Sequence, residues 1–119
     1  MSSNALANSS RKYSREKNNY KVELELVNET SEPVMFLTVL NNLSKDVYTL
    51  KLDSFDIDRE KQLSRIFQAV GEIFEEVTRS FDQLEVSDNG DSACLTFEVA
   101  MGSFRKEKIE LIAKKREGQ

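Results

Sequence analysis

A continuous apolar stripe between Leu63 and Phe81 is the feature that most restricts the fold of this chain. Its members recur at spacings of three and four residues: Leu63, Ile66, Phe67, Val70, Ile73, Phe74, Val77 and Phe81. That spacing places apolar side chains on one side of a helix. Asp56 and Asp58 precede the stripe and suit the partially positive start of a helix. We therefore expect one long helix from near Asp58 to near Phe81, whose apolar side needs a surface to cover.

Three segments before this helix have the residue pattern of strands. Residues 20–26 alternate apolar and charged side chains, which predicts a half-buried strand. Residues 34–40 are apolar at odd and even positions and rich in β-branched and aromatic types, which favours a strand covered on both faces. Alternation resumes in residues 47–52 and predicts a third strand.

Three further strands are predicted after the helix. Leu84 and Val86 begin one, a turn containing Asn89-Gly90 follows, and residues 94–101 alternate clearly. Residues 104–114 carry many lysines, which is typical of an edge strand. The order is β-β-β-α-β-β-β, which predicts an α+β fold: an antiparallel sheet with the long helix packed on one face.

Length and charge indicate one domain with two basic ends. At 119 residues a single core suffices, and we assign the domain to residues 20–115, with a short tail at 116–119. Residues 1–19 are polar and carry Arg11, Lys12, Arg15 and Lys17 against Glu16, which predicts a disordered basic arm. Residues 105–119 also carry a net charge of +3, so the middle of the chain is strongly acidic.

Familiar catalytic chemistry has no support in the sequence. The chain has no histidine, one cysteine (Cys94) and four widely separated glycines, so we expect no catalytic site, no cofactor and no metal site. No apolar run reaches the length of a membrane helix and no apolar leader is evident, which predicts a cytoplasmic protein. A small enzyme or ligand carrier with a pocket between helix and sheet remains an open alternative.

Nucleic acid is not the expected partner, because the acidic body would repel phosphates and the sheet aromatics stand beside glutamates. Association of nucleic acid with the two basic ends remains a second alternative. Ser14 follows Arg11-Lys12-Tyr13 and is a candidate for phosphorylation by a kinase that reads basic residues.

Binding of another protein is the leading hypothesis. One helix covers one face of the sheet, so the apolar segment 34–40 needs a second cover, and sheet edges accept strands from other chains. We expect a partner protein, a homo-oligomer or a large complex. The candidate partner-binding residues lie in this segment and in the basic ends: Val34, Met35, Phe36, Leu37, Val39, Arg11, Lys12, Arg15, Lys106 and Lys108.

Four motifs between Tyr48 and Lys115 carry a resemblance: Tyr-Thr-Leu-Lys-Leu at 48–52, Leu-Ser-Arg-Ile-Phe at 63–67, Leu-Thr-Phe-Glu-Val at 95–99 and Lys-Ile-Glu-Leu-Ile-Ala-Lys-Lys at 108–115. This half of the chain resembles small β-β-α-β-β modules of ciliate and other protist cytoskeleton-associated proteins. It is also similar to the globular heads of centriolar and DNA-repair coiled-coil scaffold proteins, although no heptad stalk follows Lys115. The resemblance implies a non-catalytic interaction module of the cytoskeleton or cilium and assigns no site residues.

Overall fold

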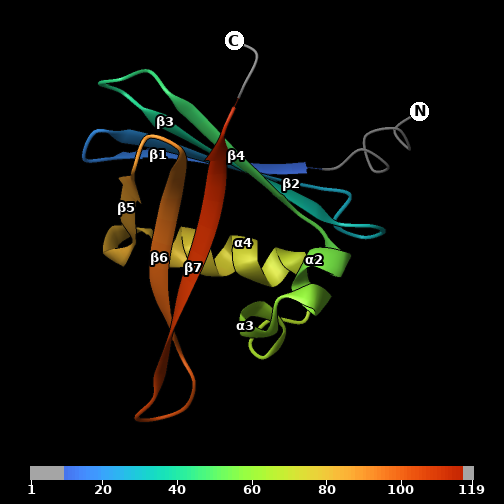
Figure 1. Cartoon of the computed structure of the whole chain (residues 1–119). Helices are drawn as coiled ribbons and strands as arrows, with labels where there is room; N and C mark the ends of the chain where they lie inside the picture. Colours follow the sequence, from blue (N-terminus) through green and yellow to red (C-terminus); the bar gives the residue numbers. More distant parts are fainter. Residues whose placement is uncertain (1–9, 117–119) are drawn as a thin grey trace.

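The computed structural model describes residues 10–116, which form one antiparallel sheet of seven strands and a set of short helical segments. Across the sheet the strands follow the order β1-β2-β3-β4-β7-β6-β5. Figure 1 shows this sheet curled, with β1–β4 on one side, β5–β7 on the other and helix α4 between them. The strands are β1 (Ser10–Lys17), β2 (Tyr20–Val27), β3 (Val34–Asn41), β4 (Val47–Leu52), β5 (Glu85–Asp88), β6 (Ser92–Ala100) and β7 (Lys106–Lys115).

The helical region is divided, so the prediction of one long helix is wrong. Its segments are α2 (Ser54–Arg59), α3 (Lys61–Ser64), α4 (Val70–Arg79) and the 3₁₀ turn η1 (Phe81–Gln83). The backbone is extended at Glu60 and Ala69, where the helical segments end and restart. A straight helix over residues 58–81 would be about 36 Å long. The breaks let the chain turn, so that every member of the apolar stripe except the half-buried Ile66 is buried against the curled sheet.

Strand β1 lies where the sequence predicts a disordered arm. Residues 10–17 pair with β2 along their whole length, so the sheet begins before the predicted boundary at residue 20. Tyr13 packs against the core, with its ring centroid 5.6 Å from that of Phe81. A strand this polar is stabilised because β2 supplies a complete ladder and α4 lies beneath its inward side chains. The first nine residues of the predicted arm, and residues 117–119 of the predicted tail, lie outside the described residues.

Strand β7 is an interior strand, which corrects the prediction that it forms an edge. It pairs with β6 along most of its length and with β4 at Thr49↔Lys114 and Tyr48↔Lys115. Its inward residues Ile109, Leu111 and Ala113 are buried. The lysines that suggested an edge all lie on the outer side of the strand, which solvent can reach. The edges of the sheet are β1 and β5.

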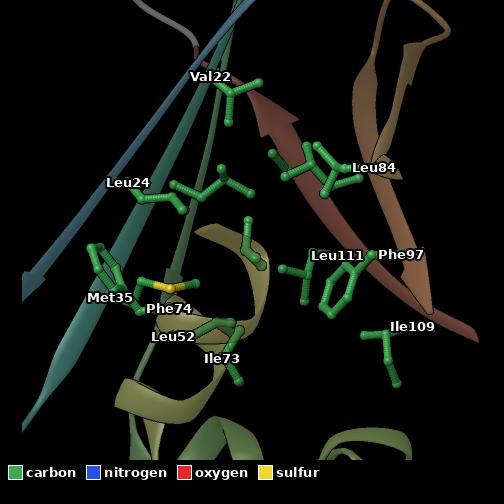
Figure 2. Close-up of a cluster of buried hydrophobic side chains, with 14 of the residues drawn as sticks. Val22, Leu24, Met35, Leu52, Ile73, Phe74, Leu84, Phe97, Ile109 and Leu111 are labelled. Carbon is green, nitrogen blue, oxygen red and sulfur yellow. The ribbon is translucent and has the colours of Figure 1, made fainter. Parts of the chain in front are cut away.

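The core lies between the two sides of the sheet and α4 (Figure 2). Leu24 and Met35 from the first side and Leu111 from the second converge on Ile73 and Phe74 of α4. Strand β3 is covered on one face only: its inward residues are fully buried, whereas Phe36 on the outer face is 41% exposed. Among residues 10–116, therefore, nothing supplies the second cover that the sequence predicts for this strand.

A polar cluster around Asp88 joins the edge strand β5 to the other side of the sheet. The Tyr20 hydroxyl donates to Asp88 Oδ1 at 2.6 Å, the Tyr48 hydroxyl donates to Oδ2, and Asn41 Nδ2 donates to Oδ1 at 3.2 Å. The hydrogen bonds from Tyr20 and Tyr48 hold the pKa of Asp88 below its usual range, and burial raises the pKa of Tyr48. This cluster, the Asp88 clasp, links β5 to β2, β3 and β4.

Candidate interaction site

The turn between β6 and β7 carries the most exposed aromatic side chain among the large hydrophobic residues described. We call Met101–Arg105 the hairpin tip; it follows the last strand pair, Ala100↔Lys106. The turn is closed by a hydrogen bond from Met101 N to Arg105 O at 2.7 Å, and Gly102 has a φ of +116° that suits glycine. Phe104 has a relative exposure of 102% and Met101 of 38%. Figure 1 shows this turn extending beyond the helices, at the bottom of the view.

Full burial of a phenylalanine side chain is worth about 1.5–3 kcal/mol relative to exposure, and the fold gains none of this from Phe104. Single exposed apolar side chains are common on protein surfaces. Here, however, two of them share one protruding turn. An apolar turn held out from the body by a paired hairpin is suited to insertion into a partner.

Basic side chains surround the hairpin tip. Arg105, Lys106 and Lys108 are all exposed, so two of the predicted partner-binding residues lie beside Phe104. Arg105 pairs with Glu107 at 3.2 Å, and Glu107 also pairs with Arg65 at 3.2 Å. The hairpin tip therefore combines an exposed apolar side chain, Phe104, with positively charged residues beside it.

A groove opens where β4 and β7 separate after their two paired positions, and α2 and α3 form its floor. We call it the β4–β7 groove. Its volume is about 240 Å³. On the β7 side, the Gln62 carboxamide takes the place of a neighbouring strand: it donates to Lys108 O at 3.3 Å and accepts from Glu110 N at 3.4 Å. The apolar lining comes from three elements, β4, α3 and β7: Leu50, Leu52, Leu63, Leu111 and Ile112.

Acidic groups predominate at the rim of the groove. Asp56, Glu60 and Glu110 stand there against Lys51 and Arg59. The backbone N–H of Asp53 and then the Arg59 guanidinium lower the pKa of Asp56, so this carboxylate stays charged. The rim has a net negative charge, opposite in sign to the hairpin tip.

The predicted binding residues of β3 divide between the two faces of the sheet. Met35, Leu37 and Val39, which the sequence suggests as partner-binding residues, are fully buried in the core and are not at the surface of the folded chain. Phe36 is on the outer face, and Val34 is half-buried on that face. The alternation of a strand explains the division, because neighbouring side chains point to opposite faces.

The predicted basic residues of β1 are used within the chain. Arg11 pairs with Glu29 and Glu75 at 3.1 Å each, with its guanidinium 5.0 Å from the centroid of Phe74. Arg15 pairs in the same way with an acidic residue next to α4, Asp82, at 3.0 Å. Lys12 is exposed on the opposite face of β1. Of these three residues, only Lys12 presents its charge to the outer face.

Sequence reasoning did not identify Phe104 as a site residue and assigned it to the start of the last strand, which in fact begins at Lys106. A signal was present: a phenylalanine that closely follows the turn residues Gly102 and Ser103 is an unusual choice for a turn. The groove had no such signal, because its lining residues are up to 62 positions apart in the sequence.

Two further features were sought in the described part of the chain, a metal-binding cluster and a membrane-spanning helix. Residues 10–116 contain no group of three or more acidic, cysteine or histidine side chains able to hold a metal ion. Within the same range no helix is long and apolar enough to cross a membrane. The inner side of α4 packs apolar residues such as Ile73 and Val77 against the sheet. No protein-family model, no curated protein and no solved structure matches the chain.

Proposed function

We propose that this chain is a non-catalytic interaction module that associates with further copies of itself, as a structural subunit of a larger assembly. The hairpin tip of one copy enters the β4–β7 groove of another. The observation that carries the proposal is the complete exposure of Phe104 at the end of a paired hairpin. The resemblance of residues 48–115 to cytoskeletal modules and scaffold heads favours the same role, in the cytoplasm and at the cytoskeleton or cilium.

The hairpin tip cannot fill the groove of its own chain. Nine cross-strand pairs hold β6 and β7 together up to Ala100↔Lys106, so the tip points away along the strand direction. Phe104 and Leu111 are seven residues apart on this hairpin, a separation of about 23 Å along an extended strand. The groove of another copy is therefore the available acceptor.

The two surfaces match in polarity and in charge. Phe104 would meet the leucines of the groove, and Arg105 and Lys106 would approach Glu60 and Glu110 at its rim. Opposite charges at the edge of an interface accelerate association and fix orientation, and the buried aromatic group supplies most of the binding free energy.

The way in which the copies insert their tips into one another's grooves determines the kind of assembly that they form. Each chain carries both a tip and a groove, so two chains can exchange tips in a closed pair, or each can engage a different neighbour in an open series. One phenylalanine and a few charges make a weak contact, which suits an assembly with many repeated contacts or a second tethering element.

The experiment compares two exposed phenylalanines. Phe104→Asp should weaken self-association by at least about tenfold, because a carboxylate cannot be buried among leucines without a partner. Sedimentation velocity over a wide concentration range measures this. Phe55→Asp is the matched control, because Phe55 on α2 is exposed too, at 77%, but lies outside the groove lining. This control substitution should leave self-association unchanged.

A second variant tests the acceptor. Ile112 lies in the groove and is 43% exposed, so Ile112→Lys should repel the basic tip while the fold, monitored by circular dichroism, is kept. If the wild type stays monomeric at all concentrations, or if the Phe104 and Phe55 variants behave alike, the proposal is wrong.

A further inference from the structure

We propose that Ser103 in the hairpin tip is a phosphorylation site for a serine/threonine kinase that reads basic residues after the serine, and that phosphate there opposes insertion of the tip. The second half of this statement rests on the proposed function, whereas the first half stands on the tip alone. In Ser103-Phe104-Arg105-Lys106, basic side chains occupy the second and third positions after the serine.

The hairpin tip is accessible to a kinase without loss of the core. Ser103 is exposed, and the segment from Met101 to Arg105 lies outside the strand ladder. The one main-chain hydrogen bond that closes this turn joins Met101 N and Arg105 O. Exposed turns of this kind adapt easily to another protein's cleft, since few contacts must be broken.

Ser14, the phosphorylation candidate that the sequence singles out, is also exposed but belongs to the strand ladder. It lies within β1 and pairs with Glu23 of β2. Arg11, three residues earlier, is on the opposite face and is held by Glu29 and Glu75. A kinase would have to remove β1 from the sheet to reach serine and arginine together. The structure therefore favours Ser103 over Ser14.

The reaction is a phosphoryl transfer from Mg-ATP supplied with the kinase. A bond forms between Ser103 Oγ and the γ-phosphorus, the bond from that phosphorus to the β,γ-bridging oxygen breaks, and ADP leaves. The hydroxyl proton passes to the kinase's catalytic base. The phosphate adds a charge of about −1.5 to −2 at neutral pH. Residues 105–108 carry a net charge of +2, so the modification nearly cancels the charge of these residues.

The phosphate changes how the tip meets the groove. It would stand directly beside Phe104, so that burial of the ring would require removal of water from a doubly charged group. It would also approach Asp56, Glu60 and Glu110 at the groove rim. Both effects act against insertion, and we expect self-association to weaken by about tenfold or more.

The first experiment locates the phosphate. The full 119-residue chain is incubated with Mg-ATP and a purified kinase that prefers Arg or Lys at the second and third positions after serine, and peptides are analysed by mass spectrometry. We expect one phosphate at Ser103, absent in Ser103→Ala, retained in Ser14→Ala, and reduced when Arg105 and Lys106 are both changed to Gln. Preferential modification of Ser14, or no incorporation at Ser103, overturns the assignment.

The second experiment measures self-association of the phosphorylated chain beside the Phe104→Asp variant. Weakening in both supports the full proposal. Weakening by Phe104→Asp but not by phosphate overturns the regulatory role and leaves the proposed function intact. If Phe104→Asp has no effect, the proposed function fails, while the first experiment still decides whether Ser103 is the acceptor.

Discussion

Strand β1 and the hairpin tip, together with the basic segment 105–108, are two positively charged regions that the fold uses in opposite ways. Residues 1–19, which include β1, and residues 105–119, which begin at the last residue of the tip, each have a net charge of +3. In β1, Arg11 and Arg15 bind carboxylates of neighbouring elements and lie over Phe74 and Phe81. Beside the tip, Arg105 pairs only with Glu107 of its own hairpin among the described residues, and Lys106 and Lys108 are exposed near an exposed phenylalanine.

The difference between the two regions arises from the elements that lie next to each of them. β1 runs past α4 and η1, where acidic and aromatic groups are within reach of its inward arginines. The end of the β6–β7 hairpin extends past the helices (Figure 1), and the ion pair from Arg65 reaches Glu107 on β7 instead of the tip itself. Positive charge therefore serves attachment within the molecule in one region and stays at an exposed surface in the other.

The largest expected effect comes from the same substitution at two phenylalanines, Phe81, which β1 contacts, and Phe104 in the hairpin tip. Phe81→Ala should destabilise the fold by about 3–5 kcal/mol, because Phe81 is 1% exposed and supports Tyr13 and Arg15. Phe104→Ala should change stability by less than about 0.5 kcal/mol, because its ring touches little of its own chain. Urea unfolding of both variants measures the contrast, and similar losses would show that the hairpin tip is part of the fold.

An intermediate effect is expected from the Asp88 clasp, which holds the β2 side of the molecule to β5. Asp88→Asn should cost about 1–3 kcal/mol at neutral pH, because Tyr20 and Tyr48 lose a charged acceptor. The folded state lowers the pKa of Asp88, so its contribution is complete above the unfolded pKa of roughly 4 and is lost as pH falls through the folded value.

Urea titrations of the wild type and of Asp88→Asn between pH 7 and pH 2.5 follow this contribution. The gap in unfolding free energy between the two should be widest near neutral pH and narrow in acid. A gap that does not change with pH would mean that the charge of Asp88 contributes nothing. Association of the variant at neutral pH should match that of the wild type, since the clasp is remote from the hairpin tip.

The smallest expected effect compares one arginine from each region. Arg11→Ala should destabilise the fold by about 0.5–1 kcal/mol through loss of its ion pairs and its contact with Phe74. Arg105→Ala should leave stability within about 0.3 kcal/mol of the wild type. The loss in Arg11→Ala should shrink in 1 M salt. Equal thermal shifts in the two variants would remove the distinction between the regions.

Local patterns predicted the strands well and the helical region in part. Alternation in residues 20–26, 47–52 and 94–101 reports side-chain direction along a strand, so β2, β4 and β6 match their predictions. The stripe from Leu63 to Phe81 identified the buried side chains but not the extended residues Glu60 and Ala69. At those two residues the chain changes direction to follow the curved sheet, and a local pattern does not record the curvature of a sheet.

The site was less accessible to sequence reasoning than the fold. Lys106 and Lys108 were selected for their charge and do lie beside Phe104, but Phe104 itself appeared to belong to a strand. Met35, Leu37 and Val39 were selected because segment 34–40 is apolar at every position but Thr38, and one face of β3 accounts for them as core. The groove required two strands to diverge, which no local pattern records.

The sequence by itself determined that the chain has an antiparallel α+β core and which side chains fill most of it, because apolar periodicity acts through nearest neighbours along a strand or helix. Only the tertiary structure decided that β1 completes the sheet, that β7 lies inside it, and that Phe104 stands clear of the other elements in residues 10–116. These outcomes depend on which segments, distant in the sequence, meet in the fold. A polar strand is ordered when such a segment pairs with it, and an aromatic ring stays exposed when none covers it.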